Sequence, residues 1–256
     1  MAENLTVHYS REEILVLQQE TTEARNFLKE NPPIFPIDDM AATIGYAEKG
    51  GSLSPLQLAS IAYFINSVEE LILFFRKSEA KSLILKQKGE NLHSFQPLYH
   101  VITRCIDENG EVLDTASEKL ASLRRKIAVL QLRIHDALEK IIHSPQTRKY
   151  LQDPIITTRS DRYVVPVKSE YKSFLKGIVH DRSASGATLF IEPLKVVELN
   201  NELNGLKKEE EIEIERILAD LSARVSKSAS ALRGNYANYC YIDAVFSRAR
   251  LSADMD

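Results

Sequence analysis

The chain has 256 residues, with 33 Lys and Arg against 36 Asp and Glu and a formal net charge of −3. Hydrophobic residues make up 44% of it, typical of a protein with a buried core, and only nine Gly and nine Pro exclude collagen-like and loop-rich chains. Its longest apolar stretches, residues 58–65 and 71–75, are far shorter than the roughly 18 residues of a membrane span. No signal sequence opens the chain, and Cys105 and Cys240 lack CxxC spacing. We therefore expect a cytoplasmic protein with reduced, buried thiols and no membrane contact.

Residues 1–112 have the pattern of a packed helical core. Ser10 and Glu13 match a capping box, and Pro55 suits the first turn of a helix that begins after Ser54. Further helices are predicted over residues 38–48, 81–86 and 95–105, and the one that begins at Ser10 continues to about residue 30. Asn109-Gly110, between two short extended arms over residues 106–113, predicts a β-hairpin.

Two long helices follow, each with a narrow apolar seam. The first is predicted over residues 115–143 of the segment 113–153, begins with a Thr115/Glu118 capping box, and would be about 45 Å long. The second is predicted over residues 194–227 of the segment 194–228, with Glu210 as the one polar residue in its stripe. Matching lengths and seams predict an antiparallel coiled-coil arm. The expected seam residues are Leu113, Ala116, Leu120, Leu123, Ile127, Leu130, Ile134 and Ile141 in the first helix, and Leu199, Leu203, Leu206, Ile214, Ile217, Leu221 and Val225 in the second.

The second half of the chain also carries an acidic run and a tyrosine group. The acidic run is predicted to be a solvated helix face, and it consists of Glu209, Glu210, Glu211, Glu213 and Glu215. The segment 229–256 is predicted to be a helix that returns to the core. Its tyrosines, Tyr236, Tyr239 and Tyr241, are expected to pack there rather than form a stacking platform.

Residues 154–193, between the two long helices, lose the helical period. They are rich in Ile, Val, Thr, Tyr and Phe, which favour strands. Strands are predicted over residues 155–159, 162–168, 177–181 and 187–192, with turns at 160–161, 169–173 and 183–186. The predicted fold class is therefore mainly α: a helical core (lever) domain with a long antiparallel coiled-coil arm that carries a small antiparallel β clamp.

Several uninterrupted strings resemble a known protein family. Residues 161–168 read DRYVVPVK, residues 177–193 read GIVHDRSASGATLFIEP, and residues 196–203 read VVELNNEL. Together they resemble the clamp of the MutS-two family, the second bacterial MutS type, and residues 106–117 are similar to the entry to its first long helix. The resemblance covers nearly the whole chain but only the core and clamp region of the family.

The resemblance implies a larger parent protein. Such a parent continues into an ABC-type ATPase domain, which binds ATP and magnesium, and a C-terminal Smr nuclease domain. The chain contains no G-x-x-x-x-G-K-S/T loop, so we expect neither enzyme activity nor a cofactor in this fragment. The resemblance also implies a homodimer whose arms enclose branched DNA, in suppression of recombination, or engage collided ribosomes and their rRNA. The sequence does not choose between DNA and ribosome, nor decide whether the fragment dimerises alone.

Charge is distributed unevenly along the chain. Residues 146–195 contain nine basic and five acidic residues, a net +4, which leaves −7 for the remainder. A basic clamp on an acidic body suits sequence-independent phosphate binding. The candidate nucleic-acid-binding residues are Arg159, Arg162, Lys168, Lys172, Lys176 and Arg182, with Tyr171 and Phe174 as candidate stacking residues. The alternatives are a solvated sheet and a structural arm for dimerisation or protein docking, without nucleic-acid affinity of its own.

Two further residue groups invite enzymatic or metal chemistry, and we predict neither. His180, Asp181, Ser183 and Ser185 could suggest a hydrolase, but adjacent strand residues point to opposite faces and no G-x-S-x-G elbow is present. Ser185-Gly186 is therefore predicted to form a turn. His135, Glu139 and His143 share one face of the first long helix, but no fourth ligand accompanies them. This trio is predicted to be a surface strip.

Overall fold

The computed structural model describes residues 10–79, 82 and 84–255, which form two compact units. The helical unit comprises the described residues up to 116 and those from 216 to 255, and the clamp unit comprises residues 117–215. Helix α8 (Leu194–Lys227) contributes its first part to the clamp unit and its last part to the helical unit.

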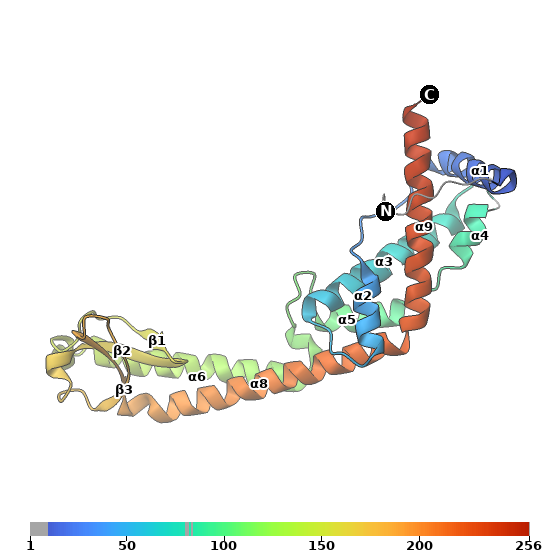
Figure 1. The fold of residues 1–256 in the computed structure, drawn as a ribbon. Coiled ribbons are helices and arrows are strands. Elements are labelled where there is room, and N and C mark those ends of the chain that lie inside the picture. The colour runs from blue at the N-terminus through green and yellow to red at the C-terminus, as the bar shows by residue number, and fades with distance from the viewer. Residues whose placement is uncertain (1–9, 80–81, 83, 256) are drawn as a thin grey trace. The chain divides into compact units, whose positions relative to one another are not determined.

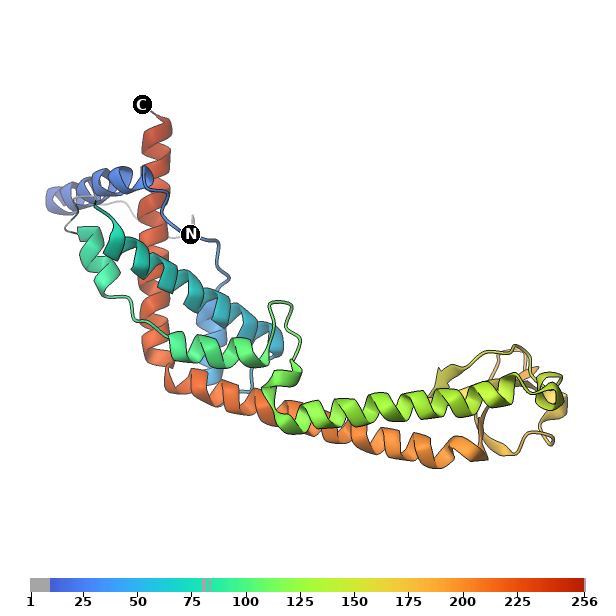
Figure 2. The ribbon, with the colours of Figure 1, turned by 180° about the vertical axis from the view of Figure 1, so that it is seen from behind.

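The helical unit is built around the apolar helix α3 (Pro55–Lys77) (Figures 1 and 2). Ser54 and Gln57 form a capping box at its start, so the helix predicted to begin there is confirmed. The other helices of this unit are α1 (Arg11–Leu28), α2 (Met40–Glu48), α4 (Ile84–Glu90), α5 (Gln96–Cys105), the end of α8, and α9 (Ala229–Asp254). Of the predicted piece over residues 81–86, residues 81 and 83 lie outside the described part of the chain.

Helix α3 has the composition of a membrane span but is packed as a core helix. The uninterrupted apolar stretches of this helix are short, but its mean hydropathy reaches 1.5 over 18 residues. By length and composition alone, the helix could therefore cross a membrane. More than half of that window, 56%, is buried inside the protein. The aromatic rings of Phe27 and Phe75 pack edge to face nearby, with centroids 5.4 Å apart. Burial and ring packing of this kind are typical of a core helix.

The tyrosines of α9 pack in the helical unit, as predicted. Tyr239 is buried, its hydroxyl donates to the Phe35 carbonyl and accepts from the Phe35 N–H, and burial raises its pKa to about 12. The half-buried Tyr236 and Tyr241 donate to the carboxylates of Asp39 and Glu20. Because each hydroxyl has an intramolecular acceptor, these rings are structural.

Both cysteines are free thiols, and the predicted burial holds for Cys105 but only in part for Cys240. Cys105 is buried and Cys240 is half-buried. Burial raises the pKa of both thiols, which keeps them protonated at neutral pH.

Both predicted capping boxes, Ser10/Glu13 and Thr115/Glu118, are wrong. Ser10 does precede α1, but its side chain makes no capping hydrogen bond. Helix α6 (Glu118–Ile142) begins three residues later than predicted, and Ser117 caps it by accepting from the Leu120 N–H. Thr115 instead donates its hydroxyl proton to a backbone carbonyl of α5 and lies in a short 3₁₀ turn, η2 (Asp114–Ala116).

The hairpin predicted over residues 106–113 is reduced to a single bridge between Ile106 and Val112. The Asp107 carboxylate accepts from the backbone N–H groups of Asn109 and Glu111, at 3.0 and 2.7 Å. Gly110 takes a positive φ of 79°, as a tight turn requires. The aspartate therefore closes a compact loop in place of a longer strand ladder.

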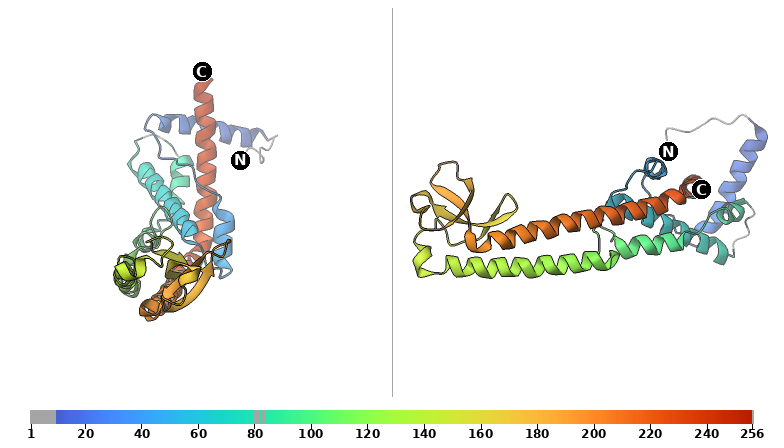
Figure 3. Two further views of the ribbon diagram at one scale, coloured as in Figure 1. Left: turned by 90° about the vertical axis from the view of Figure 1, so that its left-hand side faces the viewer. Right: turned by 90° about the horizontal axis from the view of Figure 1, so that it is seen from below.

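The clamp unit consists of a helix pair and a four-stranded sheet (Figure 3). Its strands are β1 (Thr157–Arg159), β2 (Arg162–Lys168), β3 (Gly177–Arg182) and β4 (Thr188–Pro193). They are antiparallel in the order β1-β2-β4-β3, which confirms all four predicted strands. A bulge between Val179 and Asp181 interrupts the β3–β4 register. Two short helical pieces complete the unit, α7 (Pro145–Arg148) and the 3₁₀ turn η3 (Ser169–Tyr171).

Helices α6 and α8 lie side by side and antiparallel, as the seam pattern predicts (Figure 3). Residues of α6 at every third or fourth position are buried, from Leu120 to Ile141. The far part of α6 shares one hydrophobic cluster with one face of the sheet and the start of α8. That cluster contains Ile127, Leu130, Ile134, Leu138, Ile141, Ile142, Leu151, Val165, Val167, Leu189, Ile191, Val196 and Leu203.

The acidic run of α8 is not a uniformly solvated face, because Glu213 is only 3% exposed. Its carboxylate accepts from the Ser117 hydroxyl at 2.8 Å and pairs with Lys119 at 3.3 Å. One turn earlier, Glu210 pairs with Arg124 of α6 at 2.8 Å. At this end of the clamp unit, ion pairs therefore take the place of apolar contacts between α6 and α8. The expected seam residue Ile214 is only half-buried.

Candidate nucleic-acid interface

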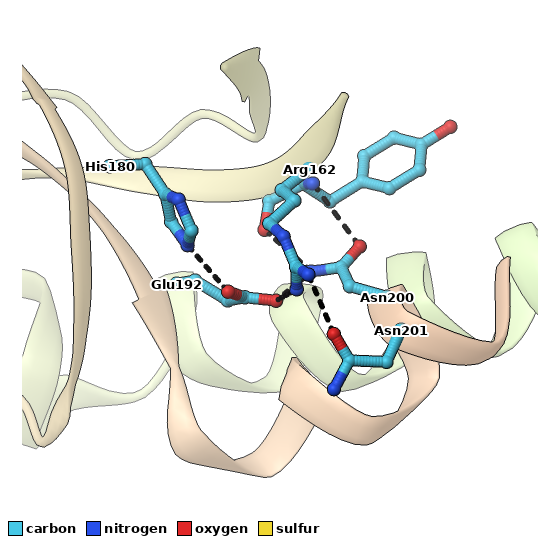
Figure 4. A network of polar contacts seen from close by, with 6 residues as sticks. Arg162, His180, Glu192, Asn200 and Asn201 are labelled. Atoms are coloured by element: carbon cyan, nitrogen blue, oxygen red, sulfur yellow. Dashed lines mark hydrogen bonds and ion pairs between the residues drawn. The ribbon is translucent and has the colours of Figure 1, made fainter. Parts of the chain in front are cut away.

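A buried carboxylate joins three elements at the base of the sheet (Figure 4). Glu192 of β4 is fully buried. One of its oxygens accepts from Arg162 Nη1 at 2.9 Å and from Asn200 Nδ2 at 2.7 Å, and the other is 2.6 Å from His180 Nε2. A buried carboxylate is stable only with such partners, so this network fixes β2, β3 and β4 together.

The network continues into the first turns of α8. The side-chain amide of Asn200 accepts from the Tyr163 N–H and donates to the Tyr163 carbonyl, both at 3.2 Å. Arg162 Nη2 donates to Asn201 at 2.6 Å. The segments that carry the family resemblance therefore contact one another. Asn200 and Asn201 of α8 form hydrogen bonds with the backbone of Tyr163 and the side chain of Arg162 in β2.

Gly177 allows β3 to approach β4 closely beside this network. A Cβ at this position would collide with the Glu192 carbonyl oxygen and the Ile191 side chain. The glycine that starts β3 is therefore required by the close strand packing.

Two of the predicted nucleic-acid-binding residues hold the clamp itself together. Arg162 serves the Glu192 network, as described above. Arg159 Nε pairs with Asp181 at 3.1 Å, and its guanidinium lies 4.0 Å from the ring centroid of Phe190. Arg159 Nη1 also donates to the Thr158 carbonyl at 2.8 Å. Both arginines are thus engaged within the sheet, and their binding role stays a prediction.

The other predicted basic residues lie at the surface. Lys172, Lys176 and Arg182 are exposed, and Lys168 is half-buried at the end of β2. Lys172 and Lys176 belong to the loop between β2 and β3, in which Glu170 is the acidic side chain. This loop is the most basic exposed segment of the sheet region.

Three aromatic rings gather beside those lysines. Tyr150 and Phe174 are stacked, with centroids 5.0 Å apart and planes 21° apart. Tyr171 contacts both rings, at 5.2 and 5.9 Å. Phe174 is 60% exposed, whereas Tyr171 and Tyr150 are half-buried. Of the two predicted stacking residues, Phe174 therefore offers the accessible ring and Tyr171 supports it.

Sequence analysis did not single out Tyr150, which lies just after α7. The Lys168 N–H donates to the Tyr150 carbonyl at 3.0 Å, and the Gln152 N–H donates to the Pro166 carbonyl at 2.9 Å. These bonds hold the segment after α7 against β2 and bring Lys149 and Tyr150 to the β2–β3 loop. We call Lys149, Tyr150, Tyr171, Lys172, Phe174 and Lys176 the aromatic-basic patch.

The two residue groups that could suggest a hydrolase or a metal site make other contacts in the structure. His180 contacts Glu192 rather than a serine, and the Ser183 hydroxyl accepts from the Thr188 N–H in the β3–β4 turn. Glu139 lies between His135 and His143 on the surface of α6, at 3.8 and 2.8 Å. No group of three or more His, Cys, Asp or Glu with metal-binding geometry occurs in the described part of the chain.

Comparison with known proteins gives a family. A search of family models finds no match. Several curated relatives do match, each named Endonuclease MutS2. That of Geobacillus sp. (strain WCH70) is 43% identical over 243 residues, which is 93% of this chain and 31% of the relative. Those of Pelotomaculum thermopropionicum and Alkaliphilus metalliredigens are 42% and 40% identical over 95% of this chain and 31% of their own length.

The chain is homologous to one segment of the MutS2 proteins. The resemblance read from the clamp strings is thereby confirmed. The chain spans 31% of the length of these MutS2 relatives, whose name describes the whole protein as an endonuclease.

Proposed function

We propose that the clamp unit binds nucleic acid through the aromatic-basic patch. The observation that carries the proposal is the exposed Phe174 ring, stacked on Tyr150 and flanked by exposed lysines. Lysines supply affinity for phosphates by releasing counterions, and an exposed ring stacks on bases of any sequence. The patch thus has the two features of a sequence-independent reader.

In the full MutS2 protein, this patch would serve a homodimer in the cytoplasm. Its target would be branched DNA, in suppression of recombination, or collided ribosomes, as the family resemblance implies. ATP, magnesium and nuclease chemistry would belong to the other domains of the parent protein. The clamp residues themselves would bind and position the nucleic acid without cleaving it.

Reversing two lysine charges tests this proposal. We expect Lys172→Glu with Lys176→Glu to weaken binding to a four-way DNA junction, a linear duplex and a structured RNA, measured by fluorescence anisotropy at two salt concentrations. The slope of log K, the association constant, against log salt is negative for phosphate binding. Loss of two phosphate contacts makes it shallower by about 1.8, at about 0.9 per contact on duplex DNA. The preferred ligand of the wild-type chain identifies the target.

The matched control is Lys126→Glu with Lys208→Glu, which reverses two exposed lysines on α6 and α8. It makes the same change in net charge outside the patch. Equal loss of affinity in both double variants would show that only total charge matters and would contradict the assignment of the patch.

Truncating the exposed ring tests the stacking component separately. We expect Phe174→Ala to weaken binding of single-stranded DNA roughly 5- to 150-fold, because stacking on one aromatic ring contributes about 1–3 kcal/mol per base. The salt slope should not change, since no phosphate contact is lost. A closed duplex without unpaired bases should bind as before.

Tyr46→Ala provides the control for this change, because Tyr46 is an exposed ring of the helical unit. Unaltered single-strand affinity in Phe174→Ala would exclude stacking on this ring.

A second candidate function is a docking arm for another protein or a second copy of the chain. It is favoured by the apolar side chains of Val129 and Leu132, which are 50% and 66% exposed on α6. Analytical ultracentrifugation separates the two functions. A well-folded chain that self-associates but binds none of the three nucleic acids would support the docking arm.

A further inference from the structure

An open cavity of about 430 Å³ lies between α5 and the last part of α8, and all its lining residues belong to the helical unit. This volume is within the range of sites that bind small molecules, roughly 300–1,000 Å³. Arg104 and His100 of α5 line it from one side, and Arg216 and Arg224 of α8 line it from the other. None of these residues belongs to the aromatic-basic patch.

The charges of the cavity are predominantly positive. Three guanidinium groups face one carboxylate, that of Asp220. Asp220 accepts from Arg224 Nε at 2.9 Å, which orients that guanidinium while leaving its terminal NH₂ groups available. Arg104 has no ion-pair partner among the residues that the structure describes. Arginines therefore outnumber carboxylates among the residues that line the cavity, and the guanidinium of Arg104 is available to a ligand.

The floor of the cavity is apolar. Val101, Ile217 and Leu221 contribute aliphatic side chains, and Ile217 and Leu221 are buried. The buried Cys105 also lines the cavity. Burial raises the pKa of its thiol, while the charges of Arg104 and Arg224 lower it and that of Asp220 raises it.

We propose that this cavity binds a phosphate-bearing ligand, with the phosphate on the guanidinium groups and an apolar moiety, such as a nucleobase, on the aliphatic floor. Arginine suits this role because its planar fork donates two parallel hydrogen bonds to phosphate oxygens. The phosphate belongs either to a free nucleotide or to the backbone of a nucleic acid. This inference is independent of the clamp, since it uses only residues of the helical unit.

Calorimetric titration of the full chain with AMP and with pyrophosphate tests the proposal. We expect Arg104→Gln with Arg224→Gln to weaken binding at least about tenfold, because hydrogen bonds to charged groups are the strong ones. Arg133→Gln with Arg250→Gln is the matched control, because both arginines are exposed and neither lines the cavity. Failure of the wild-type chain to bind any phosphate probe, or equal loss in both variants, would overturn the assignment.

A short single-stranded DNA, titrated into the Lys172→Glu/Lys176→Glu chain, separates the two sources of phosphate. Binding of DNA without AMP points to a backbone phosphate, and binding of AMP points to a free nucleotide. Alkylation of Cys105 gives a second measurement that needs no arginine variant. A ligand bound in the cavity should slow this alkylation, and the half-buried Cys240 serves as the internal reference. An unchanged Cys105 rate at saturating ligand would place the ligand elsewhere.

Discussion

Replacing Glu192 by leucine is expected to lower the free energy of unfolding of the clamp unit by about 3–5 kcal/mol. The carboxylate is fully buried and accepts from Arg162 and Asn200, with His180 at its other oxygen. Without it, the largely buried Arg162 guanidinium loses its ion-pair partner and Asn200 loses an acceptor. Hydrogen exchange of the β4 amides in the full chain measures the effect, as protection against exchange should fall by two orders of magnitude or more.

A double-mutant cycle with Arg162→Leu identifies the cause. Arg162→Leu/Glu192→Leu removes both charges, so it should cost much less than the sum of the single changes. Additive losses would mean that the pair is not coupled and that Glu192 acts through Asn200 and His180.

Replacing Leu138 by alanine is expected to destabilise the clamp unit by about 2–5 kcal/mol, through lost apolar burial and the cavity left behind. Leu138 is fully buried in the cluster that joins α6 to Val165, Val167 and Ile191 of the sheet. Urea denaturation followed by circular dichroism, with hydrogen exchange of β2, measures the loss.

Leu132→Ala is the matched control, since Leu132 lies on the same helix and is 66% exposed. Its effect should remain within about 0.5 kcal/mol. A comparable loss in both variants would show that burial in this cluster is not the source of the effect at Leu138.

The patch that we propose to bind nucleic acid was only partly visible in the sequence. Lys172, Phe174 and Lys176 lie within five residues, so local composition was enough to select them. Tyr150 is more than twenty residues from Phe174 along the chain, and only the bonds between the segment after α7 and β2 bring the two rings into contact. The run Arg148-Lys149-Tyr150, two basic residues beside an aromatic ring, could have indicated a binding residue in the sequence. It could not have indicated that Phe174 is the ring that Tyr150 contacts.

The sequence by itself determined the elements of this protein. Strand β2 and helix α8 have the predicted bounds, because periods of two and of three to four residues are local properties that each segment carries alone. The first residues of helices were predicted less accurately. Ser117 rather than Thr115 caps α6, because any nearby hydroxyl can accept from the same N–H groups.

Only the tertiary structure decided which charges remain available at the surface. Arg159, Arg162, Glu192 and Glu213 are ordinary charged residues in the sequence, yet each is bound by a partner on another element. Lys172 and Lys176, equally ordinary in the sequence, remain exposed. The physical reason is that burial and pairing depend on segments far apart in the chain, and hydrophobic periodicity specifies which face is buried but not which polar groups meet there.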